Sequence, residues 1–224
     1  MEITRVSDSI FWIKNKNRIL ATVNLTPGTS VYGERLIKHG NKEYREWNPN
    51  RSKIAAAIYK GYKNIEIHSG SSVLYLGAST GTTVSHVSDI IGEKGVVYAV
   101  EISEEVGIPL VLLAEKRRNI FPIIYDAAKL EDKKNDIEKV DFIYQDIAQK
   151  NQIEIFIRNA NLFLKSNGRG AIAIKARSID VLKDPNEIIY ESRKILEKRF
   201  KIEGSVRLDP FQKDHTMIFI SNQK

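Results

Sequence analysis

Four polar residues lie at the ends of apolar runs that are typical of buried strands. They are Glu101, Asp126, Asp146 and Lys175. In an open sheet of parallel strands, ligands bind beyond the carboxyl ends of the strands. A single polar residue at such an end is usually a loop residue, but four at successive ends indicate a shared site. Carboxylates there can accept hydrogen bonds from a ribose, and a lysine beside a carboxylate can orient a hydroxyl group.

A glycine-bounded loop lies between an apolar run at 73–76 and a helical pattern at 82–91. Such a strand–loop–helix unit leaves free backbone N–H groups at the helix N-terminus, where a ligand can bind. Glu101 follows Gly81 by 20 positions, a spacing suited to accepting hydrogen bonds from ribose hydroxyls. The dinucleotide pattern G-x-G-x-x-G fails because Ser79 stands at its second glycine. The loop therefore predicts a nucleoside-bearing cofactor, and it favours S-adenosylmethionine over NAD.

The same loop also matches G-x-S-x-G, the nucleophile elbow of α/β-hydrolases. Ser79, Asp146 and His215 even follow the chain order of a hydrolase triad. Against this alternative, Glu101 would have no role, and no HGGG-like oxyanion motif precedes the loop. A hydrolase with a Ser79 nucleophile stays open at this point.

From residue 64 onward, apolar runs alternate with helical patterns. We expect strands at 64–68, 73–76, 96–100, 120–124, 140–145, 169–175, 202–208 and 215–221. We expect helices at about 82–91, 103–117, 149–164 and 185–200. The nearly all-apolar strands are typical of a parallel sheet covered on both faces. The connection before the last strand is too short for a helical crossover, so that strand should run antiparallel. The fold class is therefore α/β, an open, doubly wound and mostly parallel sheet.

The N-terminal part has a different pattern. Residues 1–47 read as short β segments, with Asn15-Lys16-Asn17 as the turn of a hairpin between 11–13 and 19–23. Asn48 as N-cap and Pro49 as first residue predict a helix at about 49–60. We place the boundary between a small β-rich N-terminal domain, 1–55, and a Rossmann-like domain, 56–224, within this helix.

The chain has a net charge of +7, unevenly distributed. Residues 1–63 contain 12 Lys and Arg against 5 Asp and Glu, whereas residues 64–224 contain 23 of each. This excess indicates either a solvated basic face or a surface that binds a polyanion. The absence of cysteine excludes disulfides and thiolate sites, and the four histidines lack metal-ligand spacing, so no metal is expected. No apolar run reaches membrane-spanning length and no signal peptide is visible, so we expect a cytoplasmic protein without membrane contact.

Lys53, Asp146, Lys175 and His215 could form one cluster. An antiparallel last strand would bring His215, near its start, to the edge where the parallel strands end. Such a cluster could orient and deprotonate a hydroxyl group. Lysine is a poor base while it is charged, and becomes useful if its pKa is lowered or if it only positions the nucleophile.

At these residues the chain resembles fibrillarin, in the archaeal form without a Gly/Arg-rich tail. The resemblance covers nearly the whole chain, and its most specific string is Gly-Thr-Thr-Val-Ser-His-Val-Ser-Asp at 81–89. Other matching segments are 30–34, 43–45, 47–49, 51–53, 73–77, 95–101, 122–127, 146–149, 174–176 and 214–215. A usual Phe is replaced by Ile102, which changes the expected packing against the cofactor, and Asn50 also replaces a usual Phe.

The resemblance implies a seven-stranded methyltransferase sheet and a guide-directed RNA 2′-O-methyltransferase that uses S-adenosylmethionine on ribosomal RNA and tRNA. Its implied partners are the guide RNA, a box C/D scaffold protein of the Nop family and a kink-turn-binding ribosomal-type protein. The catalytic tetrad falls on Lys53, Asp146, Lys175 and His215. The cofactor contacts fall on Gly77, Gly81, Thr82, Thr83, Glu101, Ile102, Asp126, Ala127, Asp146, Ile147, Ala148 and Gln149. A non-catalytic RNA-binding subunit is a third possibility.

Overall fold

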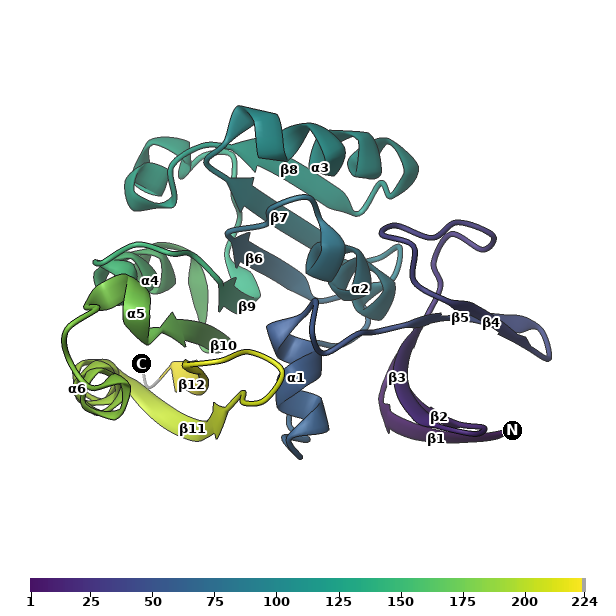
Figure 1. The fold of residues 1–224 in the computed structure, drawn as a ribbon. Helices are drawn as coiled ribbons and strands as arrows, with labels where there is room; N and C mark the ends of the chain where they lie inside the picture. The colour runs from purple at the N-terminus through teal and green to yellow at the C-terminus, as the bar shows by residue number, and fades with distance from the viewer. Residues whose placement is uncertain (223–224) are drawn as a thin grey trace.

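A computed structural model describes residues 1–222, which form two β-sheets with helices packed between and around them (Figure 1). The larger sheet has seven strands in the order β11-β12-β10-β9-β6-β7-β8. Strands β6 to β10 are parallel, and β12 runs antiparallel to both of its neighbours. The predicted mostly parallel sheet and its antiparallel last strand are confirmed. The bounds are β6 Ser72–Leu76, β7 Val96–Glu101, β8 Ile120–Ile124, β9 Val140–Gln145, β10 Leu164–Lys175, β11 Phe200–Arg207 and β12 His215–Asn222.

Helices cover both faces of this sheet because successive residues of a strand point to opposite sides. On β6, Val73 and Tyr75 join a hydrophobic cluster with α1, α2 and α3. Leu74 and Leu76 join a second cluster with η1, α4 and α6 on the other face. The bounds are α1 Lys53–Tyr59, α2 Thr82–Ile91, α3 Glu104–Lys116, the 3₁₀ helix η1 Ala127–Lys133, α4 Gln152–Phe163, α5 Ala176–Ile179 and α6 Pro185–Glu197. No helix within residues 1–222 is long and apolar enough to cross a membrane.

The predicted strand at 64–68 is wrong. This segment has no strand pairing, although Ile65 and Ile67 are buried against the core. Its alternating pattern comes from packing alone, which single-sequence reasoning cannot separate from pairing within a sheet.

The smaller sheet is antiparallel, with strand order β1-β2-β3-β5-β4, and confirms the predicted N-terminal β segments and hairpin. The bounds are β1 Glu2–Ser7, β2 Ile10–Lys14, β3 Arg18–Val23, β4 Leu36–His39 and β5 Lys42–Glu46. One of its faces shares the cluster below α1 and α2 through Ile10 and Leu20. The division into 1–55 and 56–224 stays a prediction, and residue 55 lies inside α1.

Helix α1 begins later than predicted. Its N-cap is Ser52, whose hydroxyl accepts a hydrogen bond from the N–H of Ala55 at 3.4 Å. Asn48 instead accepts one from the N–H of Asn50 at 2.8 Å, which stabilises a turn ahead of the helix. Asn and Ser both cap helices well, and here the competing turn takes Asn48.

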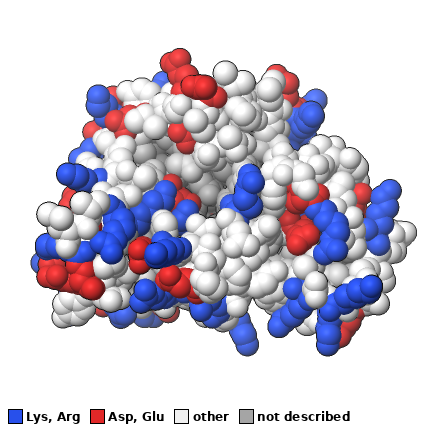
Figure 2. Space-filling model, in the orientation of Figure 1, with Lys and Arg blue, Asp and Glu red and all other residues white. Residues whose placement is uncertain are grey.

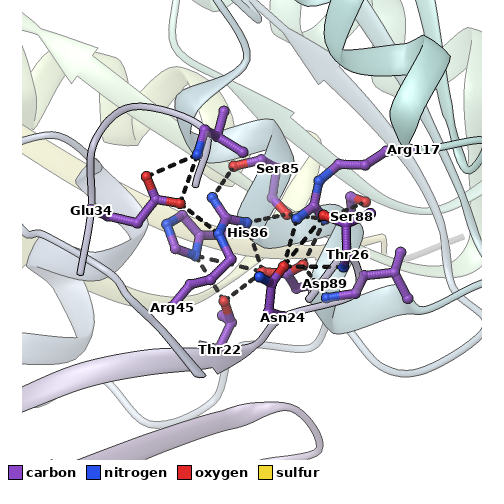
Figure 3. A network of polar contacts seen from close by, with 12 residues as sticks. Thr22, Asn24, Thr26, Glu34, Arg45, Ser85, His86, Ser88, Asp89 and Arg117 are labelled. Carbon is purple, nitrogen blue, oxygen red and sulfur yellow. Dashed lines mark hydrogen bonds and ion pairs between the residues drawn. The ribbon is translucent and has the colours of Figure 1, made fainter. Parts of the chain in front are cut away.

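Four buried charges join the two sheets (Figure 3). Asp89 of α2 pairs with Arg45 of β5 at 2.8 Å and with Arg117, which follows α3, at 2.6 Å. Arg45 also pairs with Glu34 at 2.6 Å. All four side chains are at most 1% exposed, and their charges balance. Because buried charges are stable only when paired, this network fixes the N-terminal sheet against α2.

His86 of α2 belongs to the same network. It lies 2.8 Å from the hydroxyl of Thr22 and 2.7 Å from that of Tyr32, and it stacks on Trp47 with 5.0 Å between ring centroids. Burial, followed by Arg45 and Arg117, holds the pKa of His86 well below its usual value, so the ring is neutral. The string at 81–89 therefore largely fixes the N-terminal sheet against α2, in addition to beginning at the predicted cofactor loop.

We expect Asp89→Asn to lower the free energy of unfolding by about 3–5 kcal/mol, because it leaves a buried positive charge without compensation. Asp136→Asn is the control, since Asp136 forms an exposed ion pair with Lys133 at 3.6 Å and should matter by less than about 1 kcal/mol. Urea denaturation measures both. Equal small losses would show that the network does not hold the sheets together.

Candidate active site

Asp146, directly after β9, lies at the centre of the predicted cluster. Its Oδ2 accepts a hydrogen bond from Lys53 Nζ at 2.8 Å, and its Oδ1 lies 2.8 Å from Lys175 Nζ. Lys175 also donates to the backbone oxygen of Asp146 at 3.2 Å. The three side chains are between 13% and 19% exposed. The structure thus brings together residues that are 93 and 29 positions apart in sequence.

The ionisation of Asp146 reflects opposing effects. Burial raises the pKa of its carboxyl group, but Lys53 and Lys175 lower it more, and the net pKa is below the usual value. Asp146 is therefore a carboxylate at neutral pH and can hold both lysine side chains in place.

His215 lies opposite Lys175 in the β10–β12 pairing, as the antiparallel last strand predicts. Its Nδ1 donates to the backbone oxygen of Lys213 at 2.6 Å. Burial, and then the charge of Lys53, lower the pKa of His215. The ring is neutral at neutral pH, and its Nε2 can accept a hydrogen bond.

Two glycines shape the loop between β6 and α2. Gly77 has φ +85°, and a Cβ there would lie 2.6 Å from the backbone oxygen of Asp146. Gly81 has φ +88°, and its Cβ would lie 2.6 Å from Leu113. Both conformations favour glycine, so a side chain would push the loop away from the Asp146 segment or from α3.

Glu101, at the end of β7, is fixed by backbone donors. Its carboxylate accepts hydrogen bonds from the N–H of Ser79 at 2.8 Å and of Ser103 at 3.0 Å. Glu101 therefore ties the glycine loop to the start of α3 and presents its remaining lone pairs beside the loop.

A cavity of about 310 Å³ lies between the glycine loop and the segment after β9. It is lined by eight of the twelve predicted cofactor residues, namely Gly77, Glu101, Ile102, Ala127, Asp146, Ile147, Ala148 and Gln149. Lys175 also lines it, so the cavity adjoins the lysine–aspartate cluster.

The other four predicted cofactor residues do not line this cavity. Gly81 is the N-cap of α2, where Thr82 and Thr83 form its first turn. Asp126 caps η1 by accepting a hydrogen bond from the N–H of Ala128 at 2.8 Å. The cofactor-contact role of all twelve residues stays a prediction.

Sequence reasoning missed Gln152, the first residue of α4. Its buried side chain accepts a hydrogen bond from the N–H of Lys175 at 3.1 Å and donates to the backbone oxygen of Gln149 at 2.9 Å. One amide thus joins the lysine to the cavity wall.

Tyr125, which lines the cavity directly after β8, was also missed, although its position at a strand end is one where site residues are expected.

The geometry does not form a hydrolase triad. A triad histidine bridges the serine and the acid. His215 Nδ1 instead donates to the Lys213 backbone, and Asp146 is held by two lysines. Ser79 does have a positive φ of 51°, as an elbow serine would, but here its backbone N–H binds Glu101. The hydrolase alternative is wrong, because His215 does not bridge Ser79 and Asp146.

Comparisons with known proteins agree with this geometry. A fibrillarin-like rRNA/tRNA 2′-O-methyltransferase from Methanocaldococcus jannaschii is 54% identical over 199 residues, 88% of this chain and 86% of the relative. The structure of Aeropyrum pernix fibrillarin in complex with natively bound S-adenosyl-L-methionine has 42% identity and a TM-score of 0.90, with 98% of each chain covered. A chain of a fibrillarin/Nop5p complex has 42% identity and a TM-score of 0.87, covering 96% of this chain and 98% of that chain. The sequence model of the family described as Fibrillarin matches residues 1–224, and the chain belongs to this family.

Proposed function

We propose that this chain is an S-adenosylmethionine-dependent RNA 2′-O-methyltransferase, the catalytic subunit of a guide-RNA-directed box C/D particle that acts on rRNA and tRNA. The observation that carries the proposal is that Lys175, Asp146 and Glu101 line the same cavity. This places a group that can orient a hydroxyl next to a group that can hold a ribose.

The cavity suits S-adenosylmethionine. Its volume of about 310 Å³ is in the usual range for small-ligand sites. The buried carboxylate of Glu101 can accept hydrogen bonds from ribose hydroxyls, and Gly77 lets the loop pack closely against the Asp146 segment on the other side of the cavity. Asp126 would face the adenine edge and Ile102 would pack beside it. When bound, the cofactor supplies a methyl group attached to a sulfonium sulfur. The neutral thioether is a good leaving group.

The residues of this chain mainly supply alignment. Lys175, held by Asp146, would bind the ribose 2′-oxygen and stabilise the alkoxide that forms when the 2′-hydroxyl loses its proton to solvent. Neutral His215 could accept a hydrogen bond from the ribose at Nε2, and Lys53 would complete the positive wall. Holding two reactants in line can contribute roughly 7–11 kcal/mol in favourable cases.

No base-reading module is visible, so the target nucleotide would be selected by guide pairing. The particle would contain the guide RNA, a Nop-family scaffold protein and a kink-turn-binding ribosomal-type protein. We propose that the particle acts in the cytoplasm.

Lys175→Ala tests the catalytic assignment. We expect nearly unchanged affinity for S-adenosylhomocysteine by calorimetry, because Lys175 lines the cavity but belongs to the predicted catalytic tetrad and not to the predicted cofactor contacts. Methylation by the reconstituted particle should fall by at least about 100-fold, because the lysine that aligns the hydroxyl is lost. Lys133→Ala, at an exposed ion pair, is the control.

Normal turnover by Lys175→Ala would overturn the assignment. The same titration separates the alternatives, since a purely RNA-binding subunit would not bind S-adenosylhomocysteine. A hydrolase would instead be labelled at Ser79 by a fluorophosphonate.

Gln152→Met tests whether this amide positions Lys175. The variant removes two hydrogen bonds of a buried side chain, and we expect kcat to fall by about tenfold or more while KM for RNA changes little. Asn119→Leu is a matched control, because Asn119 is also a buried amide that donates to two backbone oxygens, those of Ser88 and Gly92, each at 2.9 Å. If both folded variants lose the same activity, Gln152 has only a structural role.

The outer face of α3 is our candidate surface for the scaffold protein. Ile108, Val111 and Leu112 are 58%, 41% and 54% exposed on this one helix. In Figure 2, uncharged and acidic side chains lie together at the top of the molecule, where Figure 1 places α3. Although the chain is basic overall, α3 itself contains three Glu and one Lys. An apolar, weakly acidic face suits a protein with an apolar centre and a basic rim, and does not suit RNA.

We expect Leu112→Glu to weaken scaffold binding by at least about tenfold, because a charge would be buried in the apolar centre. Tyr190→Glu, on the exposed side of α6 (61% exposed), should bind normally. Calorimetric titration of the scaffold protein into each variant measures this. Equal affinities would place the partner elsewhere.

A further inference from the structure

Two exposed cations flank members of the catalytic cluster in sequence. Arg51 precedes Lys53 by two residues, and Lys213 precedes His215 by two. Within residues 1–222, neither Arg51 nor Lys213 forms an ion pair; Asp214, the carboxylate next to Lys213, faces Arg177 at 3.7 Å. Exposed cations that lack acidic partners are available to an anionic ligand.

Hydrogen bonds join the two chain segments that carry these cations. The side chain of Gln212, next to Lys213, donates to the backbone oxygen of Asn50, next to Arg51, at 2.9 Å. It also approaches the backbone oxygen of Pro49 at 3.4 Å. The loop between β11 and β12 is thus tied to the segment that leads into α1.

An aromatic ring also positions the guanidinium of Arg51. It lies over the ring of Tyr32, 5.6 Å from the centroid. Tyr32 itself is fixed, because its hydroxyl contacts the backbone oxygen of Glu46 at 3.0 Å and His86 at 2.7 Å. An arginine stacked on a fixed aromatic ring loses little further freedom when it binds a phosphate.

We propose that Arg51 and Lys213, joined through Gln212, form a phosphate-binding pair that receives the RNA backbone beside the target ribose. This inference rests on the proposed function. Every internal ribose 2′-hydroxyl has a phosphodiester on the adjacent 3′-oxygen. A hydroxyl placed at Lys175 therefore brings a phosphate to the margin of the cluster. Figure 2 shows Lys and Arg side chains on both sides of the hollow at the centre of the molecule, as a backbone-binding site requires.

The pair would position the substrate without reading its sequence. A guanidinium fork and an ammonium recognise phosphate oxygens, and neither needs a base edge. An A-form duplex exposes its 2′-hydroxyls in a wide, shallow minor groove, with phosphates along both margins. Arg51 and Lys213, beside the cluster, could thus bind any guide–substrate duplex in the same register, whatever its sequence.

The test is the affinity of the reconstituted particle, loaded with S-adenosylhomocysteine, for a fluorescent substrate RNA complementary to the guide. We expect Arg51→Ala and Lys213→Ala each to weaken binding by about tenfold at low salt. Each should also reduce the slope of log affinity against log salt by about 0.7–1. Arg51→Lys should keep most of the slope, since it keeps the charge. Arg18→Ala is the matched control, because Arg18 is also exposed and stacks on an aromatic ring, at 4.1 Å from Trp12, but outside the cluster.

Unchanged affinity and slope in the Arg51 and Lys213 variants would overturn the proposal. So would an equal effect of Arg18→Ala, or a parallel loss of S-adenosylhomocysteine affinity, which would indicate a structural defect. Binding is measured without turnover, and methylation by the parent particle is assayed separately. Failure of the parent to methylate would therefore contradict the proposed function, and failure of the variants to change RNA binding would contradict this inference alone.

Discussion

The placement of the N-terminal sheet depends on Asp89. Its carboxylate lies between Arg45 from the small sheet and Arg117, which follows α3, with both pairs shorter than 3 Å. Trp47 follows Arg45 by two residues and stacks on His86, and the chain then turns directly into α1. Lys53 is the first residue of that helix. A buried charge network therefore determines where Lys53, one of the proposed catalytic lysines, lies, although none of the network's members lines the cavity.

Such a network is a costly way to gain stability. Removing four charges from water is expensive, and apolar side chains of similar volume often stabilise a fold at least as well. What the charges provide is directionality. The guanidinium of Arg45 contacts Glu34, Asp89 and the hydroxyl of Ser85 at once, which only one orientation of the sheet allows. An apolar interface would tolerate small rotations. At the cluster, a shift of one ångström would break the 2.8 Å contact between Lys53 and Asp146.

The parts of the site that local patterns control could be predicted from sequence. Glu101, Asp146 and Lys175 could be placed at one sheet edge because strand ends in a parallel sheet converge there. The structure of segment 64–68 could not be predicted, because a buried loop can show the same alternation of apolar residues as a strand. The cap of α1 could not be predicted either, because both Asn48 and Ser52 are residue types that cap helices. The role of Gln152 could not be recognised from the sequence, because its two partners become neighbours only after β9, β10 and α4 assemble. The resemblance to a family located Lys53, but the role of His86 and Asp89 in fixing the N-terminal sheet needed the structure.

The charge balance of the proposed catalytic cluster fits a methyl transfer better than a hydrolysis. Lys53 and Lys175 share one carboxylate, and His215 is neutral, so the cluster carries one net positive charge. This charge would stabilise the alkoxide that forms when the 2′-hydroxyl loses its proton to solvent, before that oxygen attacks the methyl group. A bound methyl donor would be cationic, and the thioether that leaves would be neutral. A serine hydrolase has the opposite requirement, since its histidine must become an imidazolium beside an unshared carboxylate. Asp146 already has two cationic partners, so it could not serve that purpose.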